Sequence, residues 1–322
     1  MMEHTGLFRS VYSRFMRWFG DDKPETELID YVITTVEPKL KRVKNYKKRL
    51  QEPLKRCRGH CRSMVEEIPG PIYLQGSGNS DNPVIKAIFS GSEGITSLLQ
   101  KVDANTPKLA LTGNRRVALV TMTSREKTIF GRKKKGNMIV ADAAMRAITF
   151  YDHNIVGLAG TLIDSKEELE NFCLEIIAEA TARELSEIRT KLVDLRQRKE
   201  RLRAMQKMFG DNSGGMGCVF VPYDPEREKK KTKLAQMLVE TETEIADACS
   251  RSETPEDWLK IVEDFLSKPE DILSMRLVSL RLDWSNVLTD DPAEKAHTIT
   301  LATFTLADEM QREGVLIAYK QV

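Results

Sequence analysis

The sequence predicts an α+β protein: a mixed or antiparallel sheet body, a helical N-terminal region and an inserted long antiparallel coiled-coil hairpin. Three observations predict this class. Apolar residues of the N-terminal region recur about every 3.6 positions, the period of an α-helix. Heptads recur on both sides of a glycine-rich turn within residues 164–251. Apolar and polar residues alternate near the C-terminus, as in a strand with one solvated face.

Residues 1–20 predict a short amphipathic helix. Its apolar face is rich in aromatic residues, and arginines interrupt the apolar run, which is too short to span a membrane. We expect the apolar face to dock on the body or on another subunit, and attachment to an anionic membrane surface is the alternative. The residues expected to make this contact are Leu7, Phe8, Phe15, Trp18 and Phe19.

Residues 21–112 are expected to form a helical region. The apolar positions within 28–68 keep one helical phase. Pro38 and Pro53 lie inside this run and predict two kinks or breaks, because proline removes a backbone donor and crowds the preceding turn. Two shorter apolar helices are expected further along, at 84–89 and 95–99.

Residues 113–163 and 252–322 are expected to form the α+β body, with strands contributed from both sides of the insertion. Residues 116–123 are rich in β-branched and apolar side chains, and a basic turn at 132–137 separates them from further strand-like residues. Thr254 is expected to cap a helix that has proline at its first position and an acidic first turn.

The C-terminal segment carries the clearest strand pattern. Residues 278–284 alternate strictly between apolar and polar. In residues 298–306 the apolar parity switches, which predicts a β-bulge near Ala302. Residues 315–319 are expected to pair back across a turn that contains Gly314.

Residues 164–251 are expected to fold into the hairpin, reversing at the glycine-rich segment 210–217. A turn centred near residue 217 would place Lys231 opposite Arg203, so that like charges face each other. The acidic residues of 240–247 would then lie near Arg189. The expected seam pairs Leu185, Ile188, Leu192 and Leu195, continued by Leu202, Met205 and Phe209, with Leu234, Leu238, Thr241 and Ile245.

The sequence carries no short motif for catalysis or cofactor binding: neither a nucleophile elbow nor a phosphate-binding glycine loop occurs. Cys57 and Cys61 lack a second ligand pair for zinc and fall on the apolar stripe of their helix, so we interpret them as core residues. Asp152, His153 and His297 would meet only if their strands are neighbours. The sequence therefore favours a non-enzymatic protein without metal or cofactor.

The cysteines also bear on the compartment. Five cysteines are an odd number without repeating spacing, and no secretory signal is evident. This pattern favours reduced thiols in a cytoplasmic protein, with peripheral membrane attachment through residues 7–19 as the alternative.

Positive charge is concentrated in two places. Between Lys39 and Arg62, eleven basic residues accompany the single acid Glu52, and a second cluster lies at the distal end of the hairpin. Solvated helix faces are the plain explanation, and an anionic partner is the functional one. The residues expected to contact such a partner are Lys41, Arg42, Lys44, Lys47, Lys48, Arg49, Arg56, Arg198, Lys199, Arg203, Lys229, Lys230, Lys231 and Lys233.

Three functions follow from these surfaces. The leading hypothesis is a non-enzymatic interaction or scaffolding protein whose basic-tipped hairpin contacts an anionic partner or another subunit of a homo-oligomer. The first alternative is a nucleic-acid-binding protein that uses residues 39–62 and the hairpin tip, with binding that falls steeply with salt. The second is a peripheral membrane protein anchored by residues 7–19.

Overall fold

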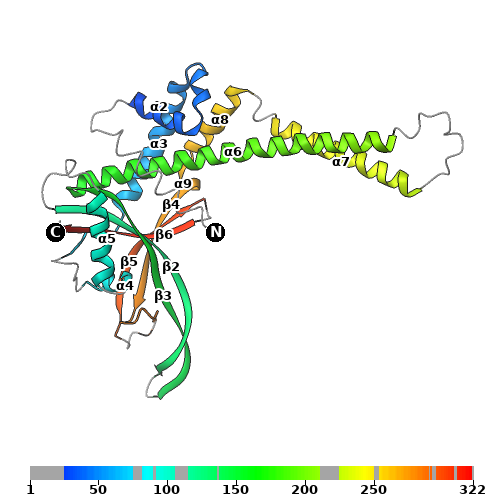
Figure 1. Cartoon of the computed structure of the whole chain (residues 1–322). Coiled ribbons are helices and arrows are strands. Elements are labelled where there is room, and N and C mark those ends of the chain that lie inside the picture. Colours follow the sequence, from blue (N-terminus) through cyan, green and yellow to red (C-terminus); the bar gives the residue numbers. More distant parts are fainter. Residues whose placement is uncertain are drawn as a thin grey trace, which may run out of the picture. The chain divides into compact units, whose positions relative to one another are not determined.

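Figure 1 shows the computed structural model, which describes residues 25–74, 82–89, 92–105, 115–135, 138–210, 225–249, 254–289, 291, 295–307 and 310–320. The expected N-terminal helix at 1–20, with its docking residues, and the expected turn at 211–217 lie outside these residues. The chain divides into two compact units. We call Lys55–Ile177 with Lys268–Val322 the sheet unit, and Lys23–Leu54 with Ala178–Ser267 the helical unit.

The sheet unit is built on a six-stranded sheet with the strand order β3-β2-β6-β5-β4, and every neighbouring pair in this order is antiparallel. The short strand β1 pairs in parallel with β6. Together with the helices, this sheet confirms the expected α+β class. The strands are β1 (Ile72–Tyr73), β2 (Arg115–Lys135), β3 (Met138–Ala159), β4 (Leu273–Leu282), β5 (His297–Leu306) and β6 (Met310–Lys320).

The sheet has a buried core on each face, because successive side chains of a strand point to opposite sides. On one face Val120, Leu301 and Ile317 pack in a cluster with helices α4 (Pro83–Ile88) and α5 (Ser92–Asn105). These two helices were expected from the sequence. On the other face, Leu119 and Phe304 line a cavity together with residues of helices α3 (Tyr46–Glu66) and α6 (Leu162–Gly210).

The expected β-bulge near Ala302 is wrong. Strand β5 pairs with β4 in an unbroken register from Leu306 to His297. The change of apolar parity has a different cause, because the two ends of β5 are covered on opposite faces. Leu301 belongs to the cluster around α4 and α5, whereas Phe304 and Leu306 line the cavity on the opposite face.

The apolar stripe expected for residues 28–68 is confirmed by burial. Its members are buried in helix α2 (Glu25–Val36), in the 3-10 helix η1 (Pro38–Arg42) and along α3, apart from Leu28 and Tyr46, which are half-buried. Pro38 begins η1, as expected of a helix break. Pro53 does not break the helix, because α3 continues through it from Tyr46 to Glu66. Of the two kinks or breaks expected, a break is therefore found at Pro38 and none at Pro53.

The helical unit contains α2, η1, the first turns of α3, the distal part of α6, and helices α7 (Pro225–Cys249) and α8 (Pro255–Leu266). Helix α8 begins as expected. The Thr254 side chain accepts from the Asp257 amide, the Asp257 carboxylate accepts from the Thr254 amide at 2.8 Å, and Pro255 takes the first position. Helix α9 (Pro269–Ile272) then begins the return into the sheet unit.

Among the described residues, no helix combines the length and the apolar composition needed to cross a membrane.

We predict that Gly70→Ala destabilises the sheet unit. Gly70 has φ +116°, and a Cβ atom there would lie 2.5 Å from the carbonyl oxygen of Leu316 in the central strand β6. Strain and a backbone clash together should lower the free energy of unfolding by about 3 kcal/mol or more. Urea unfolding followed by far-UV circular dichroism measures this change.

The matched control is Gly59→Ala, in an exposed part of α3 where a Cβ atom meets nothing within 4 Å. This change should leave stability unchanged or raise it by up to about 1 kcal/mol, because alanine favours the helix. Equal stability of the two variants would contradict the assigned conformation of Gly70.

Candidate interaction surfaces

The residues that could have formed a catalytic group do not meet. His153 lies on β3 and His297 on β5, and β2 and β6 separate these strands. The His153 ring stacks on Phe89 at 4.6 Å, and its Nε2 lies 3.1 Å from the carbonyl oxygen of Ile88. Burial lowers the pKa of His153. Its contacts are therefore those of a packed core histidine.

Asp152 is also occupied within the sheet unit. Arg312 on β6 donates to the Asp152 carboxylate at 2.8 Å and to its carbonyl oxygen at 2.6 Å. A carboxylate held in this way ties β3 to β6, because the arginine fork fixes both partners. The Asp152–His153 pair thus serves the fold of β3.

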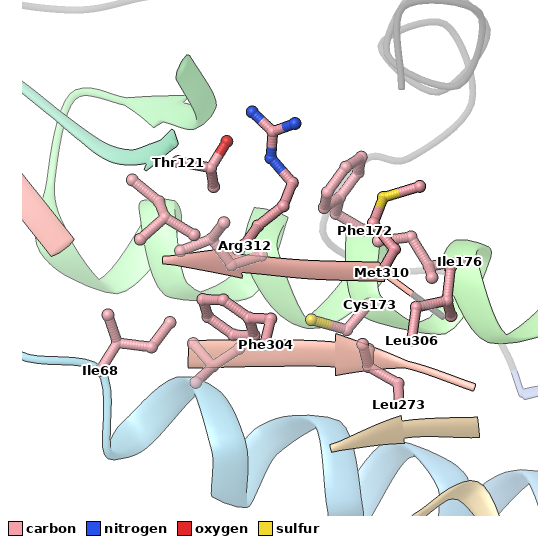
Figure 2. Close-up of a pocket in the computed structure, with 13 residues that line it drawn as sticks. Ile68, Thr121, Phe172, Cys173, Ile176, Leu273, Phe304, Leu306, Met310 and Arg312 are labelled. Carbon is pink, nitrogen blue, oxygen red and sulfur yellow. The ribbon is translucent and has the colours of Figure 1, made fainter. Parts of the chain in front are cut away.

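A small apolar cavity lies between the sheet and the helices α3 and α6 of the same unit (Figure 2). Its volume is about 50 Å³, well below the roughly 300 Å³ at which small-molecule sites begin. Phe172, Phe304 and Leu306 line it, and Arg312 extends its guanidinium away from them in Figure 2. The cavity has the dimensions and lining of a packing void rather than a cofactor site.

Cys57, Cys61 and Cys173 are buried free cysteines. The contact of Cys61 with Cys57 and its burial raise the pKa of the Cys61 thiol, and burial raises that of Cys173. Raised pKa values leave both groups as protonated, unreactive thiols at neutral pH. Within the described residues, no three histidine, cysteine or carboxylate side chains gather as a metal site would require.

Part of the first basic cluster has internal partners in the helical unit. Arg49 donates to both carboxylate oxygens of Glu263, at 2.6 and 2.8 Å, and to Glu256 at 2.6 Å. These bonds tie α3 to α8. Lys47 donates to Asp30 at 2.6 Å, which also accepts from the Tyr46 hydroxyl. Arg49 and Lys47 are therefore engaged in the fold of the unit.

The other cations of this cluster in the helical unit are differently placed. Lys41, Arg42, Lys44 and Lys48 are exposed and form no ion pair with any described residue. Arg56, the last member of the expected set in this region, belongs to the sheet unit. Of the expected contact residues before Leu54, four thus lie outside any ion pair of the described residues.

An ion pair between a buried carboxylate and a half-buried arginine stabilises the helical unit. Arg189 on α6 pairs with Glu37, which is only 7% exposed, and its guanidinium lies 4.8 Å from the ring centre of Trp258 on α8. Burial acts to raise the pKa of Glu37, but hydrogen bonds from Arg189 and from the Lys39 amide outweigh it, so the pKa is lowered. The sequence had instead suggested acidic residues of 240–247 as the neighbours of Arg189.

We predict that Glu37→Gln lowers stability at neutral pH and weakens its dependence on acid. The folded pKa of Glu37 lies below the ordinary 4.5. The stabilisation is therefore fully present above that value and is lost as pH falls through the lower folded pKa. Removing it should cost about 1 kcal/mol at pH 7, and the difference from wild type should shrink in acid.

Urea unfolding of the full chain at a series of pH values measures this dependence. Glu52→Gln, an exposed carboxylate on α3 in the same unit, is the control and should show no such difference. An identical pH profile for wild type and Glu37→Gln would rule out the stabilising role of the pair.

Helices α6 and α7 run side by side in opposite directions within the helical unit (Figure 1). Leu192, Leu195 and Leu202 of α6 are buried, as are Leu234 and Thr241 of α7. Glu242 of α7 accepts from Lys199 at 3.0 Å and from Arg203 at 3.1 Å, and these bonds lower its pKa. Apolar seam residues and cross-helix ion pairs hold this pair of helices together.

The register differs from the expected one. Glu242, not Lys231, lies beside Arg203, which corresponds to a displacement of 11 residues, or about three helical turns. The first turns of α7 accordingly extend past the end of α6. The expectation that Lys231 lies opposite Arg203 is therefore wrong. Lys231 instead pairs within its own helix with Glu228 at 3.1 Å. Met205, expected in the seam, is 45% exposed.

We predict that Leu202→Lys separates the two helices and leaves the sheet unit folded. Leu202 is 6% exposed, and a lysine head buried there without a partner would carry a large desolvation penalty. Limited proteolysis should cut α6 and α7 faster in this variant. Met205→Lys, one turn away at an exposed site, should retain the wild-type cleavage rate; equal rates for both variants would contradict the seam.

The distal part of this helix pair carries cations outside any described ion pair. Arg198, Arg201, Lys207, Lys230 and Lys233 are exposed and form no ion pair with another described residue. Lys229 and Lys231 pair only with glutamates three residues away on α7, at 3.1 Å each. Exposed pairs of this kind contribute little and are readily exchanged for another anion.

The structure adds apolar residues that sequence reasoning did not assign to a surface. Met208 is 75% exposed on α6, and Val239 is 62% exposed on α7. The helical period had placed Met205 in the seam, and only the register removes it from there. Exposed methionines beside cations form an adaptable apolar and basic surface.

Comparison with protein-family models, with curated proteins and with solved structures found no match to this chain.

Proposed function

We propose that this protein is a non-enzymatic interaction protein that uses the distal part of the α6–α7 helix pair to contact an acidic protein surface, on another protein or on a second copy of the chain. The observation that carries this proposal is the contrast along α6. Lys199 and Arg203 pair with Glu242, whereas Arg198, Arg201 and Lys207 are exposed and outside any described ion pair.

The fold of the helix pair gives no reason for this excess charge. The seam residues Leu195, Leu202 and Leu234 are buried without it, and clustered cations repel one another. An anionic partner would turn that repulsion into attraction and would also speed encounter.

Exposed apolar side chains favour a protein as this partner. Met205 and Met208 lie on the same stretch of α6 as the cations. A nucleic-acid backbone offers little for such side chains to bury, whereas a protein surface that combines acidic and apolar residues matches both features. If the distal part of the helix pair were only a solvated helix surface without a partner, neither the exposed methionines nor the exposed cations would be needed there.

We expect the Lys207→Gln, Lys230→Gln, Lys233→Gln triple variant to weaken association. The probe is a fluorescein-labelled amphipathic peptide rich in glutamate and leucine, whose binding to the full chain is followed by anisotropy at several salt concentrations. Self-association is measured in parallel by sedimentation velocity. Affinity for the peptide, or the self-association constant, should fall about tenfold, and most at low salt, because three attractive charges are removed.

A variant with Lys260, Lys295 and Lys320 changed to Gln is the charge-matched control, since all three are exposed and lie outside the helix pair. It should associate as wild type does. Thermal stability of the test variant should be equal or slightly higher. A loss of stability with association intact, or no association of the wild type with peptide or itself, would overturn the proposal.

A further inference from the structure

The sheet unit carries a second basic surface on strands β2 and β3. Strand β2 pairs with β6 only from Arg115 to Met122, but it continues to Lys135. Over that extension its pairing with β3 persists as far as Lys135 opposite Met138. Figure 1 shows the two strands extending together beyond the rest of the sheet.

The contacts that the rest of the sheet unit makes with this two-stranded ribbon of β2 and β3 end at a defined place. Val287 bridges Ala147, and the Ile148 amide donates to the carbonyl oxygen of Asn286 at 2.9 Å. Ser124 donates to Glu313 of β6 at 2.5 Å. Apart from the Leu288 amide, which donates to the carbonyl oxygen of Arg146 at 2.8 Å where the support ends, residues 125–135 and 138–146 pair only with each other among the described strands. We call this stretch the basic arm.

The arm is strongly cationic. Its sequence contains seven basic residues and two acids, Glu126 and Asp142. The pair of Arg146 with Glu126, at 2.6 Å, neutralises one of the cations. Arg125, Lys127 and Arg132 are exposed and form no ion pair with any described residue. The basic residues are Arg125, Lys127, Arg132, Lys133, Lys134, Lys135 and Arg146.

The arm also carries an aromatic side chain in solvent. Phe130 is 72% exposed, because its partner across the ribbon is the small residue Ala144. Gly131 pairs with Ala143, and Lys127 with Ala147, so that small residues occupy much of β3 along the arm. Charged residues on a free strand edge can prevent aggregation through that edge, and this role would explain the lysines. It would not explain an exposed phenylalanine.

We propose that the basic arm is a binding element for double-stranded DNA. A two-stranded ribbon fits the major groove of B-form DNA, which is about 12 Å wide. The unsupported part of β2 spans roughly 35 Å at about 3.4 Å per residue, close to one helical turn of the duplex. The cations would contact phosphates on both sides of the groove, and Phe130 would pack against base edges or wedge between bases.

The charge composition separates this arm from the helix pair. The helix pair combines cations with flexible methionines, whereas the arm combines cations with a two-stranded hydrogen-bonded backbone, small residues and one aromatic ring. A narrow ribbon of this composition can follow a groove but buries little area against a flat acidic protein. The arm and the helix pair lie in different units, so this inference does not depend on the function proposed above.

The test is binding of the full chain to a fluorescein-labelled DNA duplex of about 30 base pairs, measured by anisotropy across a series of salt concentrations. Wild type should bind with an affinity that falls linearly on a double-logarithmic salt plot. The Arg125→Gln, Lys127→Gln, Arg132→Gln variant should bind at least about tenfold more weakly at moderate salt. The salt slope should decrease in magnitude by about two to three, as expected for the loss of three phosphate contacts.

Phe130→Ala should weaken duplex binding several-fold and leave the salt slope unchanged, because it removes no charge. The charge-matched control changes Arg115, Arg276 and Lys320 to Gln; all three are exposed on strands of the same unit. This control, and the Lys207→Gln, Lys230→Gln, Lys233→Gln variant of the helix pair, should bind the duplex as wild type does. Urea unfolding of each variant checks that the sheet remains folded.

Three results would overturn the proposal. One is the absence of duplex binding by wild type at low salt. Another is an arm variant that binds as tightly as its charge-matched control. The third is equal affinity for an RNA duplex of the same length, because the deep, narrow major groove of A-form RNA does not admit the ribbon.

Discussion

The pairing of β2 with β6 ends at Met122, opposite Glu313, and the sheet unit depends on that end point. Before it, β2 is an interior strand with a packed core on each face. Val120 contributes to the cluster around α4 and α5, and Leu119 lines the cavity on the opposite face. After it, the same strand has only β3 as a described neighbour, and its side chains become exposed. The end of the pairing with β6 therefore divides β2 into a part that builds the core and a part that forms an exposed surface.

The sequence predicts elements well where a single apolar face is buried. The stripe within residues 28–68 kept one helical phase, and the residues on it, apart from Leu28 and Tyr46, are buried in the structure. It fails where both faces are buried, as in β5, because parity then no longer reports a bulge. At Pro53 the sequence allowed either a kink or a break, and the helix continues, since tertiary packing of an apolar helix face can outweigh the loss of one backbone hydrogen bond.

Long-range pairing is the part that the sequence could not supply. Arg49 belongs to a run of basic residues that reads as an open cationic face, yet its partner Glu263 is 214 positions away. Nothing local distinguishes Arg49 from Lys48, which has no described ion pair. The register of α7 on α6 is hidden for the same reason. Heptads permit several alignments that differ by whole turns, and ion pairs such as that of Glu242 with Arg203 decide between them.

The basic arm shows how the two kinds of information combine. The sequence predicted a strand at 116–123 and a basic turn at 132–137, and it gave no reason to expect an unsupported ribbon. In the structure β2 continues without a break through residues 132–135 of the expected turn. Composition supplies the cations, and strand pairing determines whether they lie over a core, beside a carboxylate or in solvent. Arg312 and Arg125 lie on strands of the same sheet, and only the former has a carboxylate partner, in Asp152. A cation is a candidate for binding a partner when the fold leaves it exposed and without a carboxylate partner. Among the described residues this is true of Arg125, Lys127 and Arg132, which lie beyond the point where β6 stops.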